Sequence, residues 1–249
     1  GDTITQLNGV TICEKYVPVR KQSANVGAGN RTRKRKDPIS PLFMEHADTE
    51  QLPYNLGAFH QGDLVEITLK MHGTSQRTGY LPMLSGYKRT LLDKLFRRPG
   101  TPIYDWGYVT GTRRVVLDTY DGGFYGSNAF REQHAKMFEG KLHKGETVYY
   151  EVVGFTDDGT PIMASCDNKK VGDKDFVKQY GKQTVFSYGC SPDSVDAPKS
   201  ALYVYRMTMT NEDGDVVEYS PFFMRYRCEQ MGVNCVPLLW SGFVPENDN

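Results

Sequence analysis

The sequence predicts an α+β protein that is rich in strands, with mainly antiparallel sheets and few helices. Most regular segments are short runs of β-branched and aromatic residues, which favour strands. Turn sequences containing Asp, Asn and Gly join consecutive runs at 157–159 and 211–214, as they do in hairpins. Only three segments combine the apolar spacing and the capping residues of a helix.

The strands are expected from residue 63 onward. Segment 147–155 predicts one most strongly, because six of its residues are Val, Tyr or Phe. A short strand or linker is expected near the start, at 10–16. The other expected strands lie at 63–69, 107–117, 161–163, 184–188, 201–210 and 216–219.

Three helices are expected. Segment 128–141 places Phe130, His134, Met137 and Phe138 on one face, and Gly140 is a plausible stop. A second helix opens with Ser220 as its cap and Pro221 at its first position, and it ends near Gly232. A third is expected at 88–97, before Pro99 and Gly100 interrupt it.

The composition is that of a folded protein with no overall charge. The chain has 249 residues, of which 39% are hydrophobic, and it balances 30 basic against 30 acidic residues. A zero net charge argues against a generally basic nucleic-acid binder, although a local patch is enough for binding. One such patch precedes residue 37, where either a contact to phosphate backbone or a solvated loop fits the pattern. It consists of Arg31, Arg33, Lys34, Arg35 and Lys36.

Cysteine and histidine usage gives no sign of a metal site. The five cysteines are odd in number and match no zinc spacing, and the five histidines are scattered. The sequence shows no apolar leader and no long apolar run. We therefore expect reduced thiols, a cytoplasmic location and no membrane partner.

A lysine stands at the end of the strand expected at 63–69, before a short polar turn that begins at Gly73. A lysine amine has a pKa of about 10.4, so a nucleophilic lysine needs burial or nearby positive charge to lower its pKa. We expect Ile67, Leu69 and Met71 to enclose Lys70, with Arg77, Arg113 and Arg114 as candidate cationic neighbours. The alternative is an ordinary surface lysine before a turn.

A glutamate interrupts the most strongly predicted strand. Glu151 stands between Tyr150 and Val152, and burying a carboxylate without a partner is costly. Either Glu151 faces solvent from an edge strand, or it has a function in a site.

These segments resemble the motifs of the covalent nucleotidyltransferases, which comprise DNA ligases, RNA ligases and mRNA capping enzymes. The run from Lys70 to Arg77 resembles motif I, residues 149–154 resemble motif III, and residues 202–206 resemble motif IIIa. His72-Gly73-Thr74, in place of the usual Asp-Gly, looks most like the phage-type nick-sealing RNA ligases. The resemblance implies a nucleotidyltransferase domain with the ATP-grasp-like ligase adenylation fold.

The resemblance also implies a reaction used in RNA repair. ATP would adenylylate Lys70, the lysyl-AMP would pass its AMP to an RNA 5′-phosphate, and a 3′-hydroxyl would then seal the break. The implied cofactors are ATP and Mg²⁺, and the implied partner is RNA, with a nicked duplex or an RNA/DNA hybrid as candidate forms.

Residue roles carry over from the same motifs. Leu69, His72, Gly73 and Arg77 would line the nucleotide site. Glu151 would bind the ribose hydroxyls or the metal. Tyr205 would stack on adenine, with Tyr203 as the second choice, although Arg206 stands where aspartate is common. Arg113 or Arg114 would bind phosphate, and strand alternation allows only one of them to enter the site.

Two motifs of the family are not found after residue 206: the glutamate-glycine strand of motif IV and the lysine-x-lysine strand of motif V. We therefore expect a truncated core at 45–249, preceded by a linker and basic arm at 1–44. Two alternatives stay open: a DNA ligase or capping-type enzyme, and a nucleic-acid-binding fragment without catalysis.

Overall fold

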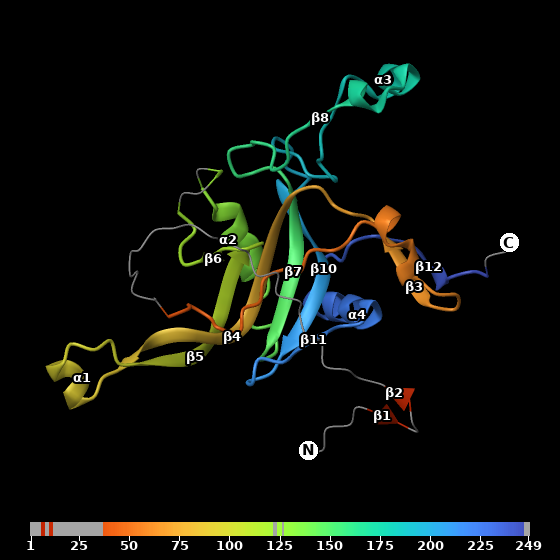
Figure 1. Cartoon of the computed structure of the whole chain (residues 1–249). Helices are drawn as coiled ribbons and strands as arrows, with labels where there is room; N and C mark the ends of the chain where they lie inside the picture. Colours follow the sequence, from red (N-terminus) through yellow and green to blue (C-terminus); the bar gives the residue numbers. More distant parts are fainter. Residues whose placement is uncertain (1–5, 8–9, 12–36, 122–123, 126, 247–249) are drawn as a thin grey trace, which may run out of the picture.

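The computed structural model describes residues 6–7, 10–11, 37–121, 124–125 and 127–246. Its centre is a six-stranded sheet in which every neighbouring pair is antiparallel (Figure 1). This confirms the predicted α+β class with antiparallel sheets and few helices. In spatial order the strands are β11 (Val216–Glu218), β10 (Ser200–Thr210), β7 (Glu146–Gly154), β4 (Thr74–Lys88), β5 (Thr101–Thr112) and β6 (Val116–Leu117).

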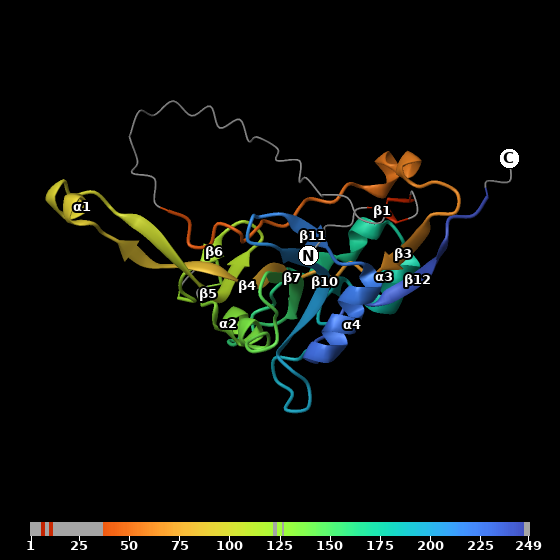
Figure 2. The same ribbon diagram turned by 90° about the horizontal axis from the view of Figure 1, so that it is seen from below.

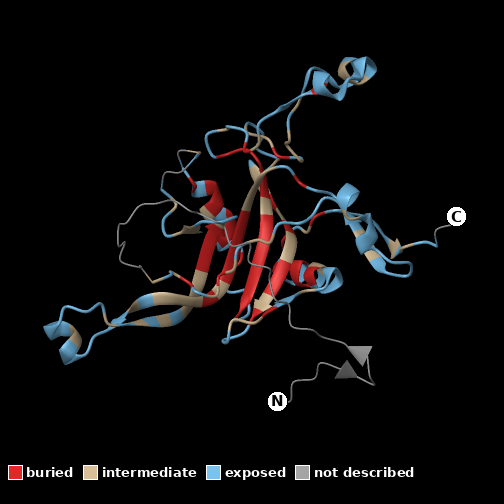
Figure 3. Cartoon of the chain, viewed as in Figure 1, coloured by how far each residue is buried: buried red, intermediate tan, exposed pale blue. Residues whose placement is uncertain are grey.

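Two helices contribute to the apolar core on one face of this sheet, α2 (Ala129–Lys136) and α4 (Pro221–Met231). Tyr150 and Val152 of β7 point into this core, and all residues of β7 except Glu151 are buried. Burial is concentrated in these central strands and in the parts of the helices that face them (Figure 3). Other members of the core are Phe130, Phe138, Leu202, Met207, Met224 and Met231.

Local sequence signals determine where α4 begins and ends. The Ser220 hydroxyl accepts a hydrogen bond from the Phe223 amide, Pro221 occupies the first helical position, and Gly232 adopts the left-handed conformation after the last turn. The prediction for this helix is therefore confirmed. Helix α2 ends five residues earlier than expected, because residues 137–141 form tight turns with i→i−3 hydrogen bonds.

A buried ion pair ties α4 to β7. The Arg227 guanidinium donates to both carboxylate oxygens of Glu146, at 2.9 and 2.7 Å, and the Tyr219 hydroxyl donates to the same carboxylate at 2.9 Å. Burial alone would raise the pKa of Glu146, but these hydrogen bonds lower it overall. The carboxylate is thus charged and fully paired inside the protein.

Strands β4 and β5 extend beyond the sheet as a long hairpin with helix α1 (Leu91–Leu95) at its tip, as Figure 2 shows from below. The sequence predicts a helix at 88–97 here, and five of those residues form it. The sequence also predicts a polar turn, not a strand, where β4 begins. Gly79, Pro82 and Gly86 weaken the strand pattern of β4, and Pro82 lies beyond the stretch that pairs with β7, where its missing N–H is tolerated.

A second sheet of two strands stands apart from the first. Strand β3 (Leu64–Thr68), which was predicted, pairs with β12 (Leu238–Phe243), which was not. The bidentate pair of Arg225 with Glu66, at 2.7 and 2.6 Å, links this sheet to α4. The remaining elements are short: β1 (Gln6–Leu7), β2 (Val10–Thr11), η1 (Leu52–Tyr54), η2 (Leu56–Ala58), β8 (Cys166–Asp167), η3 (Asn168–Val171), α3 (Lys174–Tyr180) and β9 (Gln183–Thr184).

Three expected strands differ in the structure. Segment 107–117 is divided between β5 and β6, because the Thr112 amide bonds to the Val115 carbonyl and turns the chain. Segment 161–163 makes only a single bridge, between Pro161 and Phe155. Segment 184–188 leaves the strand after Thr184, because a turn closes on Ser187 and Tyr188 has a positive φ. In the part of the chain that the structure describes, no helix is long and apolar enough to cross a membrane.

Candidate functional site

The loop from Lys70 to Gly73 joins the two sheets and crosses β7. The Gly73 amide donates to Glu151 Oε1 at 3.1 Å, although the two residues are 78 positions apart in sequence. A side chain at residue 73 would overlap the Val152 carbonyl oxygen, so glycine permits this close approach. Met71 is buried beside Val153. The loop is thereby seated on β7, while the side chain of Lys70 stays exposed.

Strand pairing brings three polar side chains into a row on the sheet face that α2 and α4 leave open. Ser75 of β4 lies opposite Glu151 of β7, which lies opposite Tyr203 of β10. Directly paired residues of an antiparallel sheet point to the same face. A bulge at Tyr205 turns that ring onto the same face, where its hydroxyl lies 2.9 Å from Ser75 Oγ. Both tyrosines thus lie near Glu151.

Burial makes Glu151 unusual among the carboxylates of the site. It raises the pKa of Glu151 from 4.5 to about 7, against the lowering effects of the Gly73 amide and of Lys70, Arg131 and Arg113. The carboxyl group is therefore close to half-protonated at neutral pH. Glu151 is part of a central strand, so the alternative of a solvent-facing edge residue is wrong.

Arg131 supports this region from the opposite face and was not singled out from the sequence. Its guanidinium donates to Thr74 Oγ1 at 2.6 Å and to the Ser75 carbonyl at 3.2 Å. Phe130 beside it is buried in the core, and Arg131 is itself almost fully buried. An arginine among the buried positions of a helix was the available signal, since a buried guanidinium requires acceptors. Arg131 fixes the start of β4, next to Gly73.

Residues 43–53 lie across the open face of the sheet. The His46 ring packs against Tyr149 and, edge-on, against Tyr205 at 5.1 Å between centroids. Burial, together with the positive charges of Arg206 and Arg113, lowers the pKa of His46 to about 4, so it is neutral at pH 7. Asp48 forms an ion pair with Arg113. This segment brings an aromatic ring to Tyr205 and a carboxylate to Arg113.

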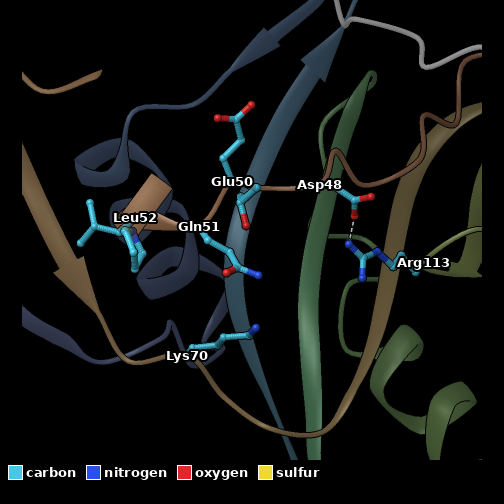
Figure 4. A pocket seen from close by; sticks show the side chains of 8 residues that line it. Asp48, Glu50, Gln51, Leu52, Lys70 and Arg113 are labelled. Carbon is cyan, nitrogen blue, oxygen red and sulfur yellow. Dashed lines mark ion pairs between the residues drawn. The ribbon is translucent and has the colours of Figure 1, made fainter. Parts of the chain in front are cut away.

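A cavity of about 750 Å³ lies between this segment and the lysine loop. Lys70 and Arg113 reach into it from opposite sides (Figure 4), and its volume falls within the range of small-molecule sites. Both side chains are cationic, whereas Asp48 and Glu50 of the same lining are acidic, so the cavity offers two cationic groups to an anionic ligand without being positively charged overall. It is lined by Asp48, Thr49, Glu50, Gln51, Leu52, Pro53, Lys70 and Arg113.

The two candidate phosphate-binding arginines differ in position. Arg113 lines the cavity, whereas Arg114 is 73% exposed and lies 4.0 Å from Asp48. Arg77 is buried away from the cavity, where it donates to the Met44 carbonyl and packs over Phe43. Within the described residues the geometry thus brings one of the three proposed arginines to Lys70.

The other residues of the lysine loop have neighbours of their own. The His72 amide donates to the Tyr188 hydroxyl at 3.0 Å, and its ring packs on Phe186 at 4.8 Å. The Leu69 amide donates to the Pro237 carbonyl at 2.9 Å. Ile67 and Leu69 are exposed, so the expected apolar enclosure of Lys70 is wrong: the two-stranded sheet has nothing packed over these side chains in the described part of the chain.

The basic residues Arg31, Arg33, Lys34, Arg35 and Lys36 lie outside the described residues. The described part of the chain contains no cluster of three or more His, Cys, Asp or Glu residues that could hold a metal ion. Glu151 is a single carboxylate. It could bind Mg²⁺ only at a site where phosphate oxygens of a substrate and water molecules supply the other ligands.

The fold and the site together define an α+β protein with a polar sheet face, partly covered by residues 43–53, beside a cavity that Lys70 and Arg113 line together with two carboxylates. No family model matches the chain, and no curated protein sequence matches it either. Among solved structures it is similar to an apo mutant of an RNA ligase from Naegleria gruberi, with a TM-score of 0.39 and 12% identity. The match covers 85% of this chain and 50% of that chain, so the chain spans about half the length of that ligase.

Proposed function

We propose that this chain is the nucleotidyl-transfer core of an ATP-dependent RNA ligase, with Lys70 as the nucleophile. One observation carries the proposal: Lys70 and Arg113 face each other across a cavity, and the loop that carries Lys70 is bonded to the partly buried Glu151. A lysine, a phosphate-binding arginine and a carboxylate are the groups that nucleotide transfer to an amine requires.

In the first step the uncharged Lys70 amine attacks the α-phosphate of ATP. A phosphorus–nitrogen bond forms, the bond from the α-phosphorus to the leaving pyrophosphate breaks, and the nitrogen releases one of its two protons to water. Arg113 stabilises the phosphate charge, because a guanidinium offers two parallel hydrogen bonds to phosphate oxygens. Lys70 lowers the pKa of Glu151, which indicates that the two charges interact.

Binding of ATP requires the segment at 43–53 to yield its contacts. A phosphate on Arg113 replaces the carboxylate of Asp48, and an adenine on Tyr205 replaces the His46 ring. An exposed ion pair contributes little, typically below about 1 kcal/mol, so replacing Asp48 by a phosphate at Arg113 costs little free energy.

The later steps use the same residues. AMP passes from Lys70 to an RNA 5′-phosphate, and a 3′-hydroxyl then displaces AMP. Mg²⁺ supplies charge neutralisation on the phosphates when it is bound, and Glu151 is the described carboxylate that would hold it.

The test is incubation of the purified chain with Mg²⁺ and α-labelled ATP or GTP, followed by denaturing electrophoresis and mass mapping of the labelled residue. Label from ATP on Lys70 is expected. Lys70→Ala and Lys70→Arg should both abolish it, since the guanidinium stays protonated at any accessible pH. Lys144→Ala, which removes an exposed lysine over the Trp106 ring, is the matched control and should label normally.

The other outcomes separate the alternatives. Label from GTP alone indicates a capping-type enzyme, and nicked DNA as the preferred acceptor indicates a DNA ligase. Label that persists in both Lys70 variants excludes Lys70 as the nucleophile. Salt-sensitive RNA binding without any label from either nucleotide indicates a binding module.

A further inference from the structure

The tip of the β4–β5 hairpin exposes apolar and basic side chains together. Helix α1 and the residue that follows it carry four large, exposed apolar side chains, and Leu91 is 84% exposed. Five basic residues within 88–98 are exposed as well. The apolar residues are Leu91, Leu92, Leu95 and Phe96, and the basic residues are Lys88, Arg89, Lys94, Arg97 and Arg98.

The charge of the tip is strongly one-sided. Segment 88–98 holds five cations and one carboxylate, a net charge of +4, in a chain whose total is zero. The single carboxylate, Asp93, is engaged in the capping box with Thr90, and these hydrogen bonds lower the pKa of Asp93. Among the described residues no ion pair engages the five cations. The tip is therefore complementary to a polyanion.

The tip is preformed. Thr90 and Asp93 cap each other at the start of α1, Arg89 Nε donates to the Pro99 carbonyl, and the Arg98 amide donates to the Asp93 carbonyl. Little ordering is then needed when a partner binds, and the cost of association falls accordingly.

The strands of the hairpin also begin and end at the candidate site. Strand β4 starts at Thr74, directly after the lysine loop, and β5 ends at Thr112, directly before Arg113. The hairpin leaves the body of the molecule on one side, with α1 at its far end (Figures 1 and 2). Fully extended, the fifteen residues of β4 at about 3.3 Å each would span about 50 Å, so the tip lies at most about this far from the start of the strand.

We propose that the hairpin tip is a second nucleic-acid contact, which binds a duplex whose reacting end lies at Lys70. We choose a nucleic acid as the partner because of the proposed function, and because β4 and β5 connect the tip directly to the candidate site. A partner that contacted only the tip would not require this connection. An arm of up to about 50 Å spans roughly 15 base pairs of B-form DNA at about 3.4 Å per base pair, and slightly more of an A-form RNA duplex, whose rise per base pair is smaller. The cations bind the phosphates, and the leucines and Phe96 contact the groove in the manner of apolar wedges.

The proposal predicts binding that depends on duplex length. We would measure fluorescence anisotropy with labelled RNA duplexes of about 24 and about 10 base pairs over a range of salt concentrations. In the tip variant Lys88, Lys94 and Arg97 are all changed to Gln. For the long duplex its affinity should fall at least about tenfold, and the slope of log K against log salt should decrease by about 2 to 3. Binding of the short duplex should not change.

A matched control removes three cations from the opposite side of the molecule. Lys169, Lys170 and Lys178, on η3 and α3, are changed to Gln, and the long duplex should then bind as it does to the unchanged protein. Equal loss for both duplex lengths, or no loss in the tip variant, overturns the proposal. So does tip-dependent binding to anionic phospholipid vesicles without tip-dependent binding to RNA.

The same variants keep this inference separate from the proposed function. AMP labelling of Lys70 does not use the tip, so the tip variant should label normally. Length-dependent, tip-dependent RNA binding without any AMP labelling supports the tip contact and refutes the ligase. Normal AMP labelling together with RNA binding that does not depend on the tip supports the ligase and refutes the tip contact.

Discussion

The six-stranded sheet and the two-stranded sheet of β3 and β12 are held in very different ways. Strand β7 is buried at every position except Glu151, and its face toward α2 and α4 is packed with large apolar side chains. Strands β3 and β12 leave Leu64, Ile67, Trp240 and Phe243 exposed, and Glu66 is bonded to Arg225 of α4. An isolated two-stranded sheet is marginal in water, whereas a covered sheet of six strands is stable.

The difference teaches how the candidate site is assembled. Glu151 belongs to the most firmly packed strand, so its position is fixed by the core. Lys70 follows the lightly anchored β3, so its position is fixed by the short loop that ends at Gly73. The two proposed site residues thus belong to regions of unequal stability, and residues of binding and catalytic sites are commonly found in segments of low local stability.

The largest effect is expected from breaking the buried pair that supports the six-stranded sheet. Glu146→Ala leaves the Arg227 guanidinium buried without its carboxylate, and should lower the free energy of unfolding by about 3–5 kcal/mol. Urea denaturation measures it. Glu218→Ala removes a more exposed bidentate pair with Arg206 and should cost at most about 1 kcal/mol. If both variants lost the same free energy of unfolding, the prediction that the buried Glu146 pair supports the core more than the exposed pair would be wrong.

An intermediate effect, an increase in the free energy of unfolding, is expected when Glu151 is replaced. Because burial raises its pKa from 4.5 to about 7, the favourable contribution of the protonated form is complete below pH 4.5 and is lost as pH rises through 7. Glu151→Gln keeps an acceptor for the Gly73 amide and does not titrate. At pH 8 the variant should be more stable than the unchanged protein by up to about 3 kcal/mol.

The pH dependence is the control for this prediction. Near pH 4.5 the two proteins should have nearly the same free energy of unfolding, since the carboxyl group is then protonated in the folded state. A stability difference that is the same at both pH values would falsify the assignment of the raised pKa to Glu151. AMP labelling of the variant should fall if Glu151 acts in the reaction.

The smallest global effect is expected in the two-stranded sheet. Arg225→Ala removes the pair with Glu66 and should change the total unfolding free energy by about 1 kcal/mol or less. The amides of β3 and β12 should nevertheless exchange with solvent much faster, while those of β7 keep their protection. Hydrogen exchange followed by mass spectrometry measures both. Glu132→Ala, which breaks the exposed pair with Lys136, should leave exchange in β3 unchanged.

Elements with strong local signals were predictable from sequence. Strand β7 follows from its run of Val and Tyr, and α4 follows from Ser220, Pro221 and Gly232. Strand β4 was missed because its glycines and proline obscure the alternation, and its pairing partners lie far away in sequence. The order of strands in the sheet depends on such distant pairings, which local patterns do not contain.

For the candidate site, the sequence named residues that the structure places near one another, but not the contacts that surround them. The motifs singled out Lys70 and Glu151, which the structure brings together through Gly73. The contacts of His46 with Tyr205 and of Asp48 with Arg113 join segments that are remote in sequence and carry no motif. Arg131 was overlooked for the same reason, because its acceptors on β4 lie more than fifty residues away.

The missing side chain at Gly73 has a consequence for natural variation. Any L-residue there would require the lysine loop to rise from β7 or the central strand to shift. We therefore expect glycine to be the sole tolerated residue at position 73 in a saturation library selected for function. The neighbouring side chain of His72 is exposed apart from its contact with Phe186, so substitutions there meet no steric conflict of the kind found at residue 73. The absence of a Cβ at residue 73 thus sets how closely the loop that carries Lys70 approaches Glu151. Sequencing the selected library should show glycine alone at position 73 and more than one residue at position 72.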